Sequence, residues 1–167
     1  MNASVRPEPE HQAYICLGSN IDPVENLGKA ISMLRQKTRL VKLSTCWESE
    51  AVGSPGPNFL NIGAAIATPL SPGELKEQVL SPIEKQLGRV RSADKYAPRT
   101  IDLDITIYDG EIRDADIWKR VYLALIFAEM LPGLRNPQTG ERLAETALRL
   151  RETHPATPHP ELEFAAP

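Results

Sequence analysis

Features that would mark a membrane, secreted or nucleic-acid-binding protein are scarce in this sequence. Aromatic residues amount to only 5% and the formal net charge is -3, so neither a stacking platform nor a broad basic surface is expected. No run approaches the roughly 20 apolar residues of a membrane helix. Residues 1–10 contain proline and charge where a signal peptide is apolar. These absences favour a globular cytoplasmic protein without a nucleic-acid or membrane partner.

Cysteine and the common nucleotide-binding motifs are equally sparse. Cys16 and Cys46 lie far apart inside apolar runs, without the C-x-x-C spacing of a metal site, so we expect buried, reduced thiols. Neither G-x-x-x-x-G-K-[ST] nor G-x-G-x-x-G occurs, which argues against a P-loop or Rossmann site. Any bound phosphate must therefore be held by side chains.

The length of 167 residues is enough for one domain with its own hydrophobic core. Proline and polar residues dominate both ends of the chain. We therefore expect flexible tails over residues 1–12 and 151–167, around a single domain of residues 13–150.

Two helices are predicted from the residues at their starts. Asp22 precedes Pro23 and is followed three positions later by Glu25, which is typical of a capping box with proline at the first helical position. Ser71 begins a second segment with the same pattern. Pro82, inside that second helix, is expected to bend it or to break its second half.

Apolar or alternating runs predict four strands, over residues 13–17, 40–52, 59–67 and 100–108. With the two helices, their order is strand, helix, strand, strand, helix, strand, which favours an α+β, ferredoxin-like βαββαβ core with an antiparallel sheet. Residues 118–131 and 140–150 are expected to add C-terminal helices.

Asp102 and Asp104 are the first candidates for chemistry. Side chains alternate along a strand, so these two carboxylates share one face while Ile101, Leu103 and Ile105 face the core. Adjacent carboxylates repel unless a cation lies between them, and hard oxygen ligands suit Mg²⁺ shared with phosphates. The alternative is a solvated strand face that is merely acidic.

A concentration of positive charge leads up to this strand. It comprises Lys85, Arg89, Arg91, Lys95 and Arg99, in a chain that is acidic as a whole. Guanidinium groups opposite a metal-binding pair are what phosphoryl transfer requires. Alternatively, Arg89 and Arg91 only complement the carbonyl end of the preceding helix, worth about 0.3–1 kcal/mol each. That alternative does not explain Arg99.

Four segments together resemble one known family. They are Leu17-Gly18-Ser19-Asn20, Phe59-Leu60-Asn61, Gly88-Arg89-Val90-Arg91 and Tyr96-Ala97-Pro98-Arg99-Thr100-Ile101-Asp102-Leu103-Asp104-Ile105. From residue 13 to residue 132 the sequence resembles the 6-hydroxymethyl-7,8-dihydropterin pyrophosphokinases of folate synthesis. The resemblance implies a ferredoxin-like fold and transfer of the β,γ-diphosphate of ATP to the pterin hydroxymethyl oxygen, with release of AMP.

The resemblance also implies roles for charged residues. Asp102 and Asp104 correspond to ligands of two Mg²⁺ ions. The residues expected to contact ATP are Glu84, Arg89, Arg91, Arg99 and Arg120. The catalytic residues are expected to be Arg89, Arg91 and Arg99 with the two aspartates, and Tyr96 falls where the family has a loop tryptophan.

A second set of residues is implied for the pterin. Phe59 and Tyr122 correspond to two rings that enclose the heterocycle, and Asn61 to the amide that pairs with its edge. Ser49 and Val52 correspond to loop positions that add contacts. Aromatic faces and one amide suit a flat ligand with a donor and acceptor edge. Without the resemblance, ordinary core packing explains Phe59 and Tyr122.

The sequence also departs from the family pattern. A histidine that usually precedes the arginine matched by Arg120 is missing from a shortened connection, residues 111–119, where Lys119 supplies the nearest positive charge. Ser81 replaces a family glutamine, and residues 53–59 are about one residue short. One hypothesis is that the C-terminal tail folds back and offers His159 instead.

Two other functions are consistent with parts of the pattern. A diverged paralogue that binds pterin or nucleotide with altered or no transfer is compatible with the missing histidine. A ferredoxin-like RNA-binding module would need stacked aromatics and a basic platform, which the composition argues against.

We expect small-molecule substrates and a monomer or weak dimer.

Overall fold

The computed structural model describes residues 9–51, 56–90 and 98–164. Four residues singled out above, Val52, Arg91, Lys95 and Tyr96, lie outside these ranges. No helix within the described ranges combines the length and apolar character needed to cross a bilayer.

Seven strands form one sheet with the order β6-β5-β1-β4-β3-β7, and β2 pairs with β4 beside β3. Every pairing is antiparallel. The strands are β1 His11–Ser19, β2 Arg39–Leu43, β3 Trp47–Ser49, β4 Phe59–Thr68, β5 Asp102–Tyr108, β6 Glu111–Ile112 and β7 Ala156–Pro158. The first strand, β1, is therefore central in the sheet, and the later strands β4 and β5 pair with it on either side.

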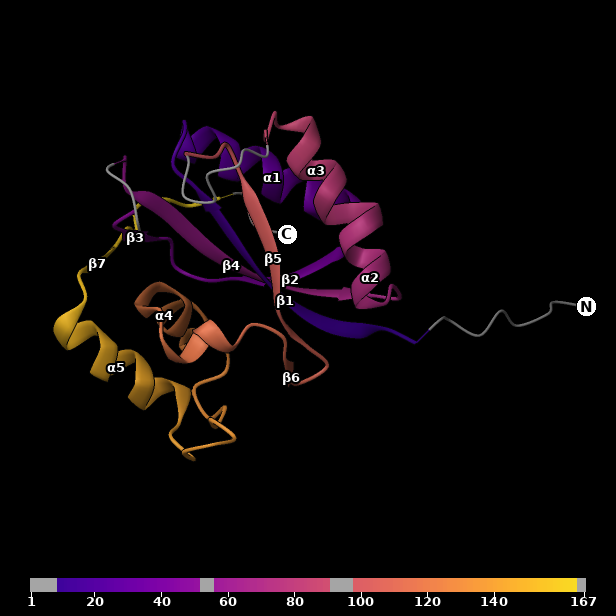
Figure 1. The fold of residues 1–167 in the computed structure, drawn as a ribbon. Helices are drawn as coiled ribbons and strands as arrows, with labels where there is room; N and C mark the ends of the chain where they lie inside the picture. Colours follow the sequence, from indigo (N-terminus) through magenta and orange to yellow (C-terminus); the bar gives the residue numbers. More distant parts are fainter. Residues whose placement is uncertain (1–8, 52–55, 91–97, 165–167) are drawn as a thin grey trace, which may run out of the picture.

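Helices cover both faces of this sheet (Figure 1). They are α1 Pro23–Lys37, α2 Pro72–Leu75, the π-helical η1 Lys76–Leu80, α3 Ser81–Gln86, the 3-10 helix η2 Ala115–Trp118, α4 Val121–Met130 and α5 Leu143–Thr153. One buried cluster joins α1 and the α2–α3 helix to the sheet through residues such as Leu34 and Ile83, and a second joins α4 and α5 to it through Phe127 and Leu143. The predicted α+β fold, with its antiparallel sheet and added C-terminal helices, is confirmed.

The predicted single strand over residues 40–52 is two strands that share β4 as partner. β2 pairs with the second half of β4 and β3 with the first half. Between them, the Ser44 hydroxyl accepts a hydrogen bond from the Gly63 N–H at 2.8 Å, and the Glu129 carboxylate accepts one from the Thr45 N–H at 2.9 Å. Side-chain oxygens thus satisfy backbone donors here, which lets the strand direction change.

The helix starts agree with the sequence only in part. Ser71 and Glu74 form the predicted capping box. Asp22 instead has φ 41° and makes no side-chain cap, so the capping box predicted at Asp22 is wrong. Pro82 does not break its helix: one π-helical turn precedes it, in which the Ser81 N–H bonds to the Lys76 carbonyl. Widening this turn accommodates a residue that has no N–H to donate.

The predicted flexible C-terminal tail is wrong for residues 151–164. α5 continues to Thr153, and β7 then pairs with β3 along its outer edge (Figure 1). We call residues 156–164 the C-terminal strap. Its Leu162 and Phe164 pack against the first core cluster. At the other end, β1 begins at His11, two residues before the predicted domain start. Without the strap, one edge of β3 would be open, and β7 supplies hydrogen-bond partners for the backbone groups along that edge.

Gly63 on β4 tests how closely α4 packs on the sheet. An added Cβ would lie 2.4 Å from Ile126 Cγ2 and 3.3 Å from Phe127 Cε1, both in fully buried side chains. Because the helix must move to accept the methyl group, Gly63→Ala should lower the free energy of unfolding by about 1–3 kcal/mol in urea titrations. Gly73→Ala, with nothing within 4 Å, is the control and should be neutral or slightly stabilising. Equal stability of both variants would contradict this packing.

Candidate active site

A cavity of about 360 Å³ opens where the ends of β1, β3, β4 and β5 meet the start of α4. Its floor is formed by strand residues, among them Gly18 and Cys16 from β1 and Asn61 from β4. The wall opposite this floor is formed by residues that precede or begin α4, among them Asp114 and Tyr122. The antiparallel register explains the meeting point, since Gly18 pairs with both Asn61 and Asp102.

The two aspartates of β5 lie on this floor. Asp102 and Asp104 both line the cavity, while Leu103 between them and Ile101 before them are buried in the core, as the alternation predicted. Asp104 is exposed toward the cavity, but desolvation by the surrounding protein, and next the negative charge of Asp102, raise the pKa of its carboxyl to about 7. A second full negative charge is therefore unfavourable in the protein alone, and a cation beside the pair would relieve it.

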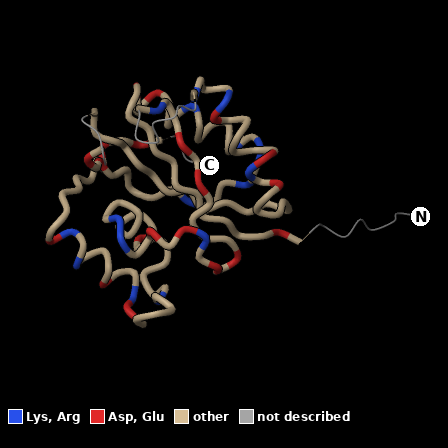
Figure 2. Tube along the Cα trace, in the orientation of Figure 1, with Lys and Arg blue, Asp and Glu red and all other residues tan. Residues whose placement is uncertain are grey.

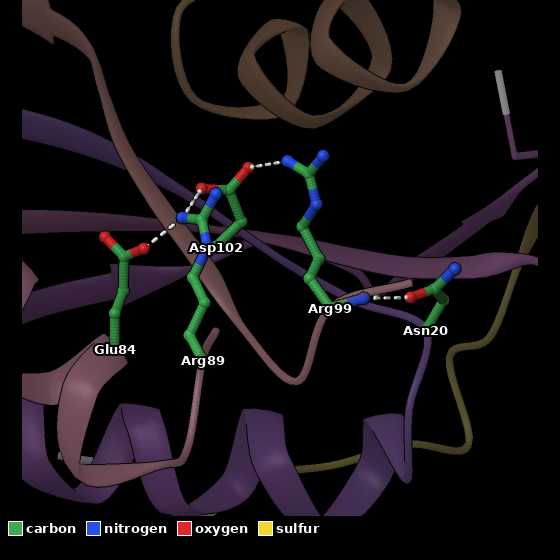
Figure 3. A network of polar contacts seen from close by, with 5 residues as sticks. All are labelled: Asn20, Glu84, Arg89, Arg99 and Asp102. Atoms are coloured by element: carbon green, nitrogen blue, oxygen red, sulfur yellow. Dashed lines mark hydrogen bonds and ion pairs between the residues drawn. The ribbon is translucent and has the colours of Figure 1, made fainter. Parts of the chain in front are cut away.

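Two arginines contact Asp102 from opposite sides (Figure 3). Arg89 Nη1 donates to Asp102 Oδ1 at 2.7 Å and also to the carboxylate of Glu84, which is 5% exposed. Arg99 Nη1 donates to Asp102 Oδ2 at 3.0 Å. Each oxygen of Asp102 thus holds one guanidinium group next to the cavity. Glu84 and Arg89 reach Asp102 from the α3 side, and only Arg99 of the two arginines lines the cavity itself.

Asn20 fixes the segment that carries Arg99 (Figure 3). Its Oδ1 accepts a hydrogen bond from the Arg99 N–H at 2.8 Å, and its own N–H donates to the Arg99 carbonyl at 3.2 Å. Its Nδ2 donates to the Pro57 carbonyl at 3.3 Å. Asn20 belongs to the segment Leu17-Gly18-Ser19-Asn20, but no role was predicted for it. The feature of the sequence that could have indicated this role is a polar amide directly after a buried strand.

An amide and two aromatic rings also line the cavity. Asn61, which is 3% exposed, donates from Nδ2 to Ser49 Oγ at 2.9 Å and to the Trp47 carbonyl at 3.3 Å. These bonds fix the orientation of the amide. Phe59 and Tyr122 line the same cavity from β4 and α4. Burial raises the pKa of the Tyr122 hydroxyl, so it stays neutral at physiological pH. Four of the five predicted pterin contacts are therefore brought together.

Two carboxylates in the segment before α4 were missed by the sequence analysis. Asp114 and Asp116 both line the cavity. Asp114 Oδ1 accepts from the Asp116 N–H at 3.0 Å, and Asp116 Oδ2 accepts from Arg120 Nε at 3.2 Å. Arg120, predicted to contact ATP, therefore lines the cavity as an ion pair with Asp116. In the sequence, the only indication that Asp114 and Asp116 belong to the site was their position in the shortened connection, residues 111–119, where the family has a histidine.

The charges around the cavity do not balance. Its described lining includes five carboxylates, of Glu50, Asp102, Asp104, Asp114 and Asp116, and two guanidinium groups, of Arg99 and Arg120. Figure 2 shows acidic residues along β5 and both signs of charge on the surrounding helices. A polyphosphate entering this cavity alone would meet more negative than positive charge, so divalent cations would have to accompany it.

Comparisons with known proteins identify one family. Residues 14–132 match the family described as 7,8-dihydro-6-hydroxymethylpterin-pyrophosphokinase, HPPK. The 2-amino-4-hydroxy-6-hydroxymethyldihydropteridine pyrophosphokinase of Pseudomonas aeruginosa is 34% identical over 146 residues, covering 80% of this chain and 88% of that protein. The protein of the same name from Synechocystis sp. is 32% identical over 150 residues, covering 83% of this chain and 76% of that protein.

Solved structures show the same fold. A crystal structure of Plasmodium falciparum HPPK-DHPS superposes with a TM-score of 0.70 at 11% identity, covering 89% of this chain and 47% of that one. This chain thus spans about half the length of that protein, and the likeness concerns the fold alone. Fold and site together define an α+β protein with an acidic cavity that is also lined by aromatic side chains. The family match over residues 14–132 is more specific: the chain belongs to the HPPK family.

The raised pKa of Asp104 predicts how stability depends on pH without divalent cations. The folded protein binds a proton at Asp104 more tightly than the unfolded chain, so this residue stabilises the fold most below pH 4 and that contribution is lost as pH rises to about 7. Asp104→Asn should therefore become more stable relative to the native sequence between pH 4 and pH 8, measured by thermal unfolding in chelator.

Glu141→Gln is the control for this pH series. Hydrogen bonds from Arg149 and Thr146 lower the pKa of Glu141 to about 2, and Arg149 keeps its charge throughout, so the stability of this variant relative to the native sequence should stay level over the same pH range. If Asp104→Asn followed the control, the desolvation and charge repulsion assigned to Asp104 would be wrong.

Proposed function

We propose that this chain transfers diphosphate from ATP to the hydroxymethyl oxygen of 6-hydroxymethyl-7,8-dihydropterin, giving AMP and the pterin diphosphate, in folate biosynthesis. The observation that carries the proposal is one cavity lined by two kinds of group. The Asp102–Asp104 pair with its arginines comes from β5 and the segments before it, and the fixed amide of Asn61 with two aromatic rings comes from β4 and α4. The first suits a polyphosphate and the second a flat heterocycle.

Asp102 and Asp104 are the proposed ligands of Mg²⁺, with two ions expected when ATP is bound. The fit is chemical: both supply hard carboxylate oxygens, and Asp104 has a raised pKa that a cation would lower. In the described ranges no group of three or more His, Cys, Asp or Glu side chains is placed to hold a metal. Phosphate oxygens and water would complete the coordination, which is how Mg²⁺ binds in many ATP sites. Bound there, the metal would neutralise phosphate charge.

The protein's own groups would then position the two substrates. Arg89 and Arg99 would exchange Asp102 for phosphate oxygens, and Arg120 would contribute a third guanidinium from the start of α4. Glu84, which pairs with Arg89, would keep that arginine oriented. Asn61 and Ser49 would read the edge of the pterin while Phe59 and Tyr122 bury its faces. The aromatic and acidic sides would thus bring the hydroxymethyl oxygen near the phosphates.

The remaining expectations concern the protein in the cell. We propose that it acts in the cytoplasm as a monomer or weak dimer on ATP and the pterin alone. The free, buried thiols of Cys16 and Cys46 support the cytoplasmic location.

The reaction product tests the proposed function. Incubated with Mg²⁺, ATP and 6-hydroxymethyl-7,8-dihydropterin, the protein should release AMP and not ADP, as separated by ion-exchange chromatography. Asp102→Asn and Asp104→Asn should each lower the rate by about 100-fold or more because charge stabilisation in the transition state is lost. Asp109→Asn, on the same hairpin but outside the cavity, should keep the native rate. ADP as product, or native rates in the Asp102 and Asp104 variants, would contradict the proposal.

Gly18 tests the pterin side independently of catalysis. A Cβ at this position would lie 3.1 Å from Asn61 Oδ1 and 3.8 Å from Phe59 Cδ1. Gly18→Ala should raise the Kd for the pterin at least about tenfold in calorimetric titrations, because the methyl group occupies ligand space beside the amide. Gly28→Ala, whose Cβ would make an ordinary 3.8 Å contact with Phe164, is the control and should bind normally. Unchanged affinity in Gly18→Ala would place the pterin elsewhere.

A further inference from the structure

The C-terminal strap is joined to the strand that carries Ser49. Ala156, Thr157 and Pro158 of β7 pair with Ser49, Glu48 and Trp47 of β3. Directly after β7, the His159 N–H donates to the Cys46 carbonyl at 2.8 Å. The strap therefore completes the outer edge of β3, on the side away from β4 (Figure 1).

The His159 ring links this strap to two carboxylates. Its Nε2 lies 2.8 Å from Glu48 Oε1, and its Nδ1 lies 2.7 Å from Glu161 Oε1. The hydrogen bonds to Glu161 and Glu48 raise the pKa of His159. An imidazolium can donate from both nitrogens, whereas a neutral ring donates from only one. The positive charge therefore lets one ring satisfy both carboxylates.

Glu48 also contacts the residue that precedes the next strand, β4. Its second oxygen, Oε2, accepts a hydrogen bond from Asn58 Nδ2 at 2.7 Å. Asn58 directly precedes Phe59, and Glu48 directly precedes Ser49. In the sheet register Ser49 pairs with Phe59, and both line the cavity. The series His159, Glu48, Asn58 thus joins the strap to the beginning of β4, next to two residues of the pterin side.

We propose that His159 is a positioning residue for the acceptor: through Glu48 and Asn58 it holds the β3–β4 ends so that Ser49 and Phe59 meet the flat ligand. This inference rests on the proposed function. His159 touches no reacting group and is not catalytic. The groups assigned to ATP come from α3, from the segment before β5 and from α4, so His159 should act on the affinity for the pterin and not on that for the nucleotide.

Three substitutions separate this role from a purely structural one. His159→Ala removes the donor to Glu48, and His159→Gln keeps a neutral donor. Glu161→Gln, the matched control, alters only the outer partner of the ring. Two dissociation constants are measured by calorimetry for each full-length variant, for a non-hydrolysable ATP analogue with Mg²⁺ and for the pterin added to that complex, together with the midpoint of thermal unfolding.

His159→Ala should raise the Kd for the pterin about 5–10-fold and change that for the ATP analogue less than twofold. His159→Gln should recover most of the loss, and Glu161→Gln should bind both ligands normally. Because His159 and Asn58 act through the same carboxylate, His159→Ala combined with Asn58→Ala should bind the pterin no more weakly than Asn58→Ala alone.

Other outcomes would overturn the inference. Equal changes in both dissociation constants would indicate general loosening, unchanged pterin affinity would remove the role, and additive effects with Asn58→Ala would break the link through Glu48. If the native protein bound the ATP analogue but no pterin, the proposed function would itself fail and the inference with it. Native pterin binding that His159→Ala leaves intact would overturn the inference alone.

Discussion

The repulsion between Asp102 and Asp104 is the constraint on which the rest of the site depends. The two carboxylates share one face of β5, and desolvation of Asp104 together with the charge of Asp102 makes a second negative charge costly. In the protein alone, Arg89 and Arg99 occupy both oxygens of Asp102. The same guanidinium groups suit phosphate, so an arriving cation and polyphosphate would replace one set of ion pairs by another. The site is thus arranged to exchange partners with little change in total charge.

The sheet brings the two sides of the site together because its central strands share a register. Gly18 of β1 pairs with Asn61 of β4 and with Asp102 of β5, which places an amide and a carboxylate on either side of one glycine. Its missing side chain leaves space for a ligand between them. α4 covers this position through the second core cluster and contributes Tyr122. The same packing that stabilises the fold therefore also closes the cavity.

Local patterns predicted much of this arrangement, and contacts between distant segments account for what they missed. Alternation alone placed Asp102 and Asp104 on one face, because strand geometry is local. Asn20 could not be assigned, because its partners Arg99 and Pro57 are distant in sequence. The strap is predicted as a loose tail because its proline and polar residues are typical of one, whereas the open edge of β3 and the core residues against which Leu162 and Phe164 pack come together only in the folded protein. The roles of the predicted site residues in binding and catalysis stay predictions.

A crystal structure of the protein with Mg²⁺, a non-hydrolysable ATP analogue and the pterin tests the central claim most directly. The account predicts Mg²⁺ within about 2.1 Å of oxygens of Asp102 and Asp104, with Arg89 and Arg99 turned from Asp102 to the phosphates. Carboxylates that stayed paired with both arginines, with ion and triphosphate bound elsewhere, would contradict it.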